Sequence, residues 1–227
     1  YNKGNKAFDW KVETTDKWIK LDKQSGKTLL QDRISVSVDW SNVPKGPHIT
    51  GEITITSGSE EQKVYLPIFN PESPTSQELE GWYVEDNGCV SINAGAFHRK
   101  QENEDITIRT IKGLGYENEC LQLGEATKPV QEIWKLNETP KAEYDFYTFR
   151  AGTVTVHIYA LPLFPINSER DTRYGIMIDD GMVHWMTTAS KEYSSQWKLN
   201  VARNAAISTV NLNIEKPGEH TLKLLCG

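Results

Sequence analysis

The chain has 227 residues, of which 37% are hydrophobic and 25% charged, so it can bury a core in one large domain or two small ones. The net charge of −6, the pI near 5.5 and the lack of any run of Lys and Arg argue against binding to nucleic acid or an anionic membrane surface. No apolar run approaches the roughly 20 residues that span a bilayer, and residues 1–6 lack the pattern of a signal peptide.

Hydrophobic and polar residues alternate in the first third of the chain, which predicts strands rather than helices. We expect strands at 33–40, 52–56 and 64–69, and Pro67 indicates that the last one either lies at a sheet edge or breaks its ladder there. Turn clusters rich in Pro, Gly and Ser separate these strands, as in a β-sandwich. Residues 1–75 are therefore predicted to form a small immunoglobulin-like β-sandwich. Its core is expected to contain Trp10, Trp18 and Trp40.

A domain boundary is predicted at 70–80, because this stretch is polar, contains two prolines and lacks periodicity. The alternation resumes after it and predicts a larger, jelly-roll-like β-sandwich over residues 80–227. No helix longer than a turn or two is expected. The fold class is thus all-β, with two tandem sandwiches. The expected strands of the second are 89–92, 106–108, 144–146, 153–159, 209–214 and 220–225.

Asp179 and Asp180 stand side by side between apolar runs and raise the question of a catalytic pair. Asp-Gly between alternating apolar residues is a strong hairpin signal, which puts Asp180 and Gly181 at the turn. That register sets Ile176 opposite Trp185 and directs both toward the core. Glycosidase carboxylates flank the scissile bond about 5 to 9 Å apart, whereas neighbours at a hairpin tip diverge. The pair is interpreted as a turn.

Other reaction centres are also missing from the sequence. It has no Gly-x-Ser-x-Gly, HExxH or phosphate-binding loop, and its five histidines lack ligand spacing. Cys89, Cys120 and Cys226 cannot all pair with one another and are interpreted as small buried thiols in strands. We therefore predict no catalytic residue, no metal site and no cofactor.

Seven segments along the second domain, and three in the first, carry a family resemblance. No segment is specific by itself, but in this order they resemble the C-terminal region of glycoside hydrolase family 115, the xylan α-1,2-glucuronidases, and the small sandwich that precedes it. The segments are 90–99, 111–115, 142–147, 161–167, 173–181, 197–204 and 218–223, with 33–40, 51–55 and 64–71 upstream.

The resemblance implies that the catalytic machinery lies N-terminal to this region, in a barrel domain of the same polypeptide. The first hypothesis is accordingly a non-catalytic accessory region that supports the catalytic part and self-associates, for example as a homodimer. The implied substrate polymer, glucuronoxylan, does not enter cells intact, so an extracellular or periplasmic location is expected. A free-standing adhesion protein of tandem sandwiches would show the same alternation, but the resemblance counts against it.

The alternative hypothesis is a carbohydrate-binding module, in which aromatic rings stack on sugars. Tyr193 and Trp197, expected in a loop at 191–198, are the best candidates, and Trp134 in a polar stretch is another. Each of these aromatics is more often a packing residue than a sugar platform.

A third possibility is that Arg170 and Arg173 help to bind the anionic glucuronate, since arginine binds carboxylates in a bidentate manner. The competing interpretation is a solvated loop in which these arginines pair with Glu169 and Asp171.

Overall fold

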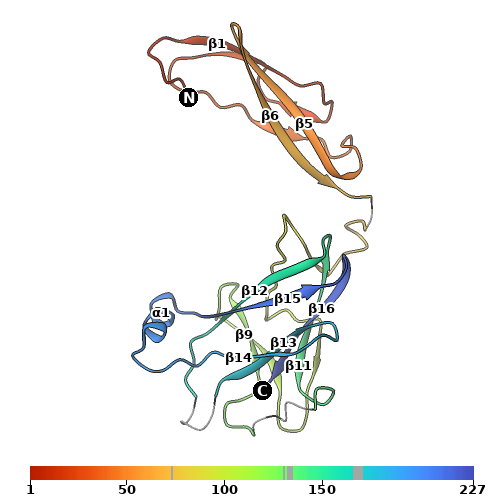
Figure 1. Cartoon of the computed structure of the whole chain (residues 1–227), viewed down its shortest axis with the longest axis vertical. Coiled ribbons are helices and arrows are strands. Elements are labelled where there is room, and N and C mark those ends of the chain that lie inside the picture. Colours follow the sequence, from red (N-terminus) through yellow and green to blue (C-terminus); the bar gives the residue numbers. More distant parts are fainter. Residues whose placement is uncertain (73, 130, 132–134, 166–170) are drawn as a thin grey trace. The chain divides into compact units, whose positions relative to one another are not determined.

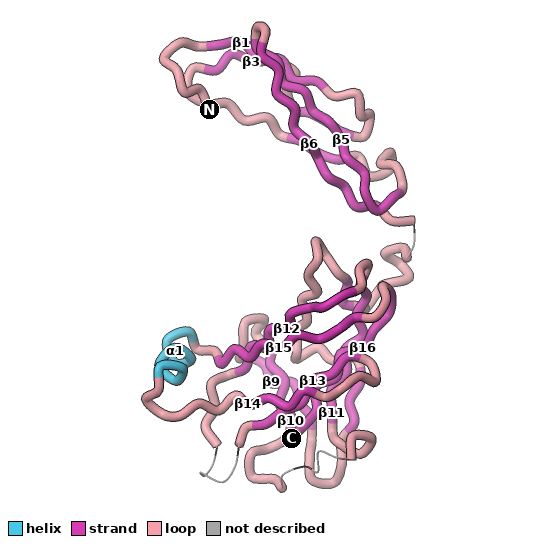
Figure 2. Tube along the Cα trace, in the orientation of Figure 1, coloured by secondary structure: helices cyan, strands magenta, loops and turns pink. Residues whose placement is uncertain are grey.

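The computed structural model describes the chain except residues 73, 130, 132–134 and 166–170. It contains two compact units, Tyr1–Glu78 and Leu79–Gly227. Strands dominate both units (Figure 1), which confirms the predicted all-β class. Within the described residues one α-helix is present, α1 (Ser195–Arg203), in a region that was expected to be a loop (Figure 2).

The first unit is built from a larger sheet, with strand order β3-β1-β5-β6, and a smaller sheet that pairs β2 with β4. Apolar side chains of the two sheets form one core, in which Trp10 and Trp18 are buried as predicted. The prediction for Trp40 was wrong, because this side chain is 60% exposed. The alternation ends early: β4 stops at Val38, and a turn closed by Asn42 N–H and Asp39 O follows. The strands are β1 (Phe8–Glu13), β2 (Ile19–Leu21), β3 (Ser25–Thr28), β4 (Val36–Val38), β5 (Gly46–Ser57) and β6 (Glu60–Asn70).

Two features of the first unit follow directly from its sequence. Strand β6 lies at the edge of the larger sheet, the first of the two alternatives that Pro67 indicated, since proline cannot donate a ladder hydrogen bond. On the neighbouring strand β5, Gly51 allows the core to close, since a Cβ atom there would lie 2.6 Å from atoms of both Trp18 and Ile19. Any larger residue at that position would displace the buried indole.

The second unit contains a main sheet with strand order β14-β13-β16-β11-β7, and β8 also pairs with β11. Strands β11 and β16 run antiparallel over eight paired positions and form the centre of this sheet. Its inner face carries Tyr144 and Ile176, both fully buried. The strands are β7 (Tyr83–Val84), β8 (Arg99–Gln101), β11 (Lys141–Thr148), β13 (Arg173–Ile178), β14 (His184–Thr187) and β16 (Gly218–Cys226).

Two pairs of strands supply the other side of this core. Strand β12 (Gly152–Ala160) pairs with β15 (Ala206–Ile214), and β9 (Ile108–Lys112) pairs with β10 (Glu119–Leu123). Inward side chains of both pairs belong to the same hydrophobic cluster as the main sheet. The second unit is therefore a sandwich whose core is formed by side chains of alternate residues from each layer.

The hairpin between β13 and β14 turns one residue earlier than predicted. Gly181 N–H donates to Ile178 O at 3.0 Å, and Asp179 has a positive φ of 53°, so Asp179 and Asp180 are the central residues. In the observed register, which differs by one residue from the predicted one, Trp185 lies opposite Gly175 and not opposite Ile176. Because a slip of one residue reverses the face of a strand, Trp185 lies on the outer face of the sheet. The predicted core position of Trp185 was wrong.

Contacts with β16 explain this register. The Asp179 carboxylate lies 2.8 Å from His220 Nδ1 and accepts a hydrogen bond from Thr221 N–H at 2.8 Å. Lys223 Nζ donates to Asp180 at 2.9 Å, and this ion pair lowers the pKa of the Asp180 carboxyl. Both carboxylates are thus engaged in holding the hairpin against its neighbouring strand.

All three cysteines are free thiols. Cys226 is buried in β16, in agreement with the prediction of a small core residue. Cys120 in β10 is half-buried, whereas Cys89 is exposed and lies outside the named strands, so the prediction of a buried thiol was wrong for Cys89.

Candidate functional site

The helix α1 is defined by caps that its sequence supplies. The Ser194 side chain accepts a hydrogen bond from Trp197 N–H at 3.1 Å, the usual N-cap arrangement. Asn204 ends the helix in the left-handed region, with φ 51°. Asn200 is the buried residue of the helix, and its side-chain oxygen accepts hydrogen bonds from both Gln196 and Arg203. The buried face of α1 is therefore polar.

Two of the predicted sugar-binding residues meet at the start of this helix. The rings of Tyr193 and Trp197 lie 5.2 Å apart between centroids, tilted by 54°. Phe164, which the sequence did not single out, adds a third ring 6.5 Å from Trp197. Tyr193 is 69% exposed and Phe164 is 55% exposed, whereas Trp197 is half-buried. The three rings form a cluster that is open to solvent but not coplanar.

The exposed side of α1 continues this cluster with aliphatic side chains. Val201 follows Trp197 by four residues and shares its face of the helix, whereas Leu199 projects from the other side. Each of these two side chains is about half exposed. We refer to the exposed apolar residues in and around the helix as the α1 surface. It consists of the exposed Phe164, Tyr193, Leu199 and Val201 together with the half-buried Trp197.

The α1 surface has the chemistry of a contact surface rather than of a reaction centre. A soluble helix normally buries its apolar residues, whereas α1 buries Asn200 and exposes Leu199 and Val201. The Nε1 atom of Trp197 is buried and has no hydrogen-bond partner in the part of the chain that the structure describes. Exposed apolar clusters of this kind mark sites of protein or ligand contact.

Arg173 lies at the start of β13, and its guanidinium carbon is 5.3 Å from the centre of the Trp185 ring. The predicted ion pair with Asp171 does not form; that carboxylate instead accepts hydrogen bonds from Thr172 N–H and the Thr187 hydroxyl. The ion pairs of the described residues include none of Arg173, and its Nε atom is buried without a hydrogen bond. The cation therefore lies against an aromatic face.

The remaining candidates lie outside the described residues. These are Trp134 and Arg170, together with Glu169, the other acidic residue considered as an arginine partner. The structure thus brings together Tyr193 and Trp197, and it places Arg173 on Trp185 of the β13–β14 hairpin.

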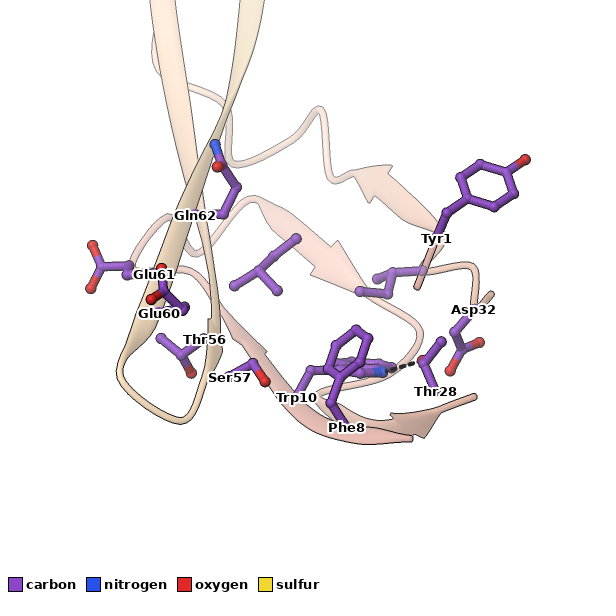
Figure 3. Close-up of a pocket in the computed structure, with 12 residues that line it drawn as sticks. Tyr1, Phe8, Trp10, Thr28, Asp32, Thr56, Ser57, Glu60, Glu61 and Gln62 are labelled. Carbon is purple, nitrogen blue, oxygen red and sulfur yellow. Dashed lines mark hydrogen bonds between the residues drawn. The ribbon is translucent and has the colours of Figure 1, made fainter. Parts of the chain in front are cut away.

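The first unit contains an open hollow of about 290 Å³ near the tip of the β5–β6 hairpin (Figure 3). Phe8 and Trp10 supply aromatic rings to its lining, and Glu60 and Glu61 supply carboxylates. Trp10 Nε1–H donates to Thr28 Oγ1 at 2.9 Å, so the indole is already satisfied. The Ser57 hydroxyl in the lining donates to Asp9 O at 2.8 Å and not to a carboxylate, so it is not paired with a base.

Within the described residues, no group of three or more His, Cys, Asp and Glu side chains is arranged so that it could hold a metal ion. The same part of the chain includes no helix that is long and apolar enough to cross a membrane.

Comparison with known proteins gives one family match. The family model described as the glycosyl hydrolase family 115 C-terminal domain matches residues 82–226. Among solved structures, the chain is similar to BtGH115A, described as a family GH115 4-O-methyl-α-glucuronidase with specificity for decorated arabinogalactans. The identity is 22% and the TM-score 0.43, over 57% of this chain and 16% of the solved chain. The search of curated proteins found no match.

Proposed function

The chain belongs to glycoside hydrolase family 115 through its C-terminal domain, and we propose that it is a non-catalytic accessory region of an α-glucuronidase. Its catalytic partner is the upstream domain of the same polypeptide, and the polymer on which that domain acts is glucuronoxylan. Such a polymer places the enzyme outside the cell or in the periplasm. The match of the family's C-terminal domain model to residues 82–226 supports the proposal.

The α1 surface is the observation that carries this proposal. A capped helix that exposes Leu199 and Val201 beside the rings of Tyr193 and Trp197 offers an apolar surface to another protein surface. Aromatic residues that are surrounded by aliphatic ones have the composition of an interface core. We assign this surface to contact with the catalytic part of the enzyme or with a second copy of the chain.

The test is to place a charge on this surface in the full-length enzyme. Val201→Glu and Leu199→Glu are expected to weaken self-association or to lower activity on glucuronoxylan by about tenfold, because a carboxylate in an apolar interface is desolvated without a partner. Met182→Glu is the matched control, since Met182 is 74% exposed at a hairpin in the same unit. Mass measurement by light scattering and turnover of decorated xylan are the two readouts. Unchanged mass and turnover in both α1 variants would contradict the proposal.

Sugar binding is a second candidate function, favoured by the exposure of Tyr193 and by the position of Arg173. An exposed ring can stack on a pyranose, and an arginine without a carboxylate partner can bind a glucuronate. Titration with aldouronic acids and with decorated arabinogalactan tests it by calorimetry. Tyr193→Ala should abolish stacking, and Arg173→Lys should weaken binding of the acidic sugar alone. Equal affinity of both variants and the unmodified chain would exclude this candidate.

A further inference from the structure

The ribbon of β12 and β15 exposes a face that the proposed function does not use. The two strands pair from Gly152 with Ile214 to Ala160 with Ala206. Their inward side chains, including Val156 and Leu212, pack on the core of the second unit. The outward side chains form what we call the ribbon face. It consists of Thr153, Thr155, His157 and Tyr159 from β12, with Ile207, Thr209, Asn211 and Asn213 from β15.

The ribbon face contains no Lys, Arg, Asp or Glu, although a quarter of the chain is charged. The outward face of the main sheet differs, since it carries Glu143, Asp145 and Lys223. Asn is depleted from strands because its amide competes for backbone hydrogen bonds, yet Asn211 and Asn213 both occupy this face. The strand propensities of these residues do not explain why the ribbon face has two Asn residues and no charged ones. This composition favours a role in binding.

The polar groups of the ribbon face are already aligned across the two strands. Thr155 Oγ1 donates to Asn211 Oδ1 at 3.0 Å, and His157 Nδ1 lies 3.1 Å from Thr209 Oγ1. These contacts orient the side chains across the two strands, and the hydrogen bonds of the described residues do not engage the Asn211 amide nitrogen or His157 Nε2. The result is an ordered row of uncharged donors and acceptors, which reduces the side-chain entropy that a ligand would have to remove.

Aromatic rings lie at one end of this row. Tyr159 is 58% exposed, and its ring meets that of Tyr116 edge to face, with 5.7 Å between centroids. Tyr116, which is 76% exposed, belongs to the turn between β9 and β10. Tyrosine offers a rigid ring at a low entropic cost, with a hydroxyl at its rim. Two exposed rings from different elements therefore extend the ribbon face beyond its own strands.

We propose that the ribbon face, together with Tyr116, binds a neutral oligosaccharide. Sugar hydroxyls would bond to the Thr, His and Asn side chains, and one pyranose ring would stack against Tyr159. Residues 153–159 span about 20 Å at roughly 3.3 Å per residue, which is long enough for several sugar units. Nucleic acid is a poor occupant because the face has no cation. A protein partner is disfavoured because the outward side chains of the ribbon strands are polar apart from Tyr159 and Ile207, so the face lacks the apolar centre of a protein interface.

Calorimetric titration of the 227-residue chain with xylohexaose and with β-1,3-galactohexaose tests the proposal. Tyr159→Ala is expected to weaken binding of the recognised sugar about tenfold, and Asn211→Ala about threefold to tenfold. Tyr65→Ala is the matched control, because Tyr65 is 60% exposed in the other unit, and its affinity should equal that of the unmodified chain. Because all three side chains are exposed, the unfolding midpoints should not change.

Tyr193→Ala, included in the same series, separates this site from the α1 surface. Retained affinity in Tyr193→Ala with loss in Tyr159→Ala assigns the sugar to the ribbon face. Loss in Tyr193→Ala alone overturns the assignment, as does the absence of binding to either hexaose at about 1 mM. Neither of these two outcomes affects the accessory function, which is tested by association of the full-length enzyme.

Discussion

Replacing His220 should test how the β13–β14 hairpin is held in register. The imidazole is buried and faces two oxygen acceptors: Nδ1 lies 2.8 Å from an Asp179 carboxylate oxygen, and Nε2 lies 2.9 Å from Lys216 O. Its ring also packs against Phe146, with 5.4 Å between centroids. His220→Leu keeps an apolar side chain against Phe146 and removes both polar contacts.

The expected loss follows from these two contacts. A hydrogen bond to a carbonyl such as Lys216 O contributes about 1 kcal/mol. The contact between His220 and the Asp179 carboxylate would contribute more if it were fully buried. Because the Asp179 side chain is 51% exposed, solvent screening reduces this contribution to about 1–2 kcal/mol. The free energy of unfolding should therefore fall by about 2–3 kcal/mol.

Urea unfolding followed by tryptophan fluorescence measures this loss. Asp179→Asn removes the partner charge and keeps a residue that tolerates the positive φ, so the double variant isolates the coupling between the two side chains. Glu219→Gln, at an exposed position next to His220, is the control and should change stability by less than about 0.5 kcal/mol. A loss below about 1 kcal/mol for His220→Leu, or no coupling in the cycle, would refute the account of the register.

Four further outcomes are expected. Gly175→Val should lower the free energy of unfolding by about 1–3 kcal/mol, because a Cβ atom at this position would lie 2.8 Å from the Val183 side chain. Urea unfolding measures this loss, and unchanged stability would show that the strand can shift. Burial raises the pKa of the Cys226 thiol to about 11. At pH 8 a thiol reagent should therefore label the exposed Cys89 and should not label Cys226 until the chain unfolds. Equal labelling rates of the two cysteines would contradict the burial of Cys226. The raised pKa of Cys226 also makes stability fall as pH rises from about 9 toward 11, because the unfolded thiol ionises first. Burial likewise raises the pKa of Tyr144, so the stability that its neutral form contributes should be lost as pH rises above about 10, and a flat pH profile there would argue against it.

The sequence predicted those features that depend on the alternation of side chains along one strand. Ile53 and Trp10 are buried where the period of two placed them, and Pro67 occupies an edge strand. This works because the direction of a side chain in a strand follows from its position in the strand. The prediction for Trp40 was wrong because strand β4 ends at Val38, and beyond a strand's end the alternation no longer sets the direction of a side chain.

The candidate site was predictable only in part. Tyr193 and Trp197 were chosen for their residue types, and they do contact one another. The sequence did not predict the helix that carries Trp197, because its nine residues are too few to show the periodicity of hydrophobic residues that indicates a helix. Its caps, Ser194 and Asn204, were the available signal. No local pattern indicated Phe164, which reaches Trp197 from a distant segment.

By itself the sequence determined the all-β class, the alternation of buried and exposed positions within each strand, and the family resemblance. Only the tertiary structure decided which strands became neighbours and in which register. The turn at Asp179 depends on His220, 41 residues away, and the uncharged ribbon face exists only because residues 152–160 pair with 206–214. Alternation fixes which side chains of one strand point the same way, but contacts between segments far apart in the chain decide what they face.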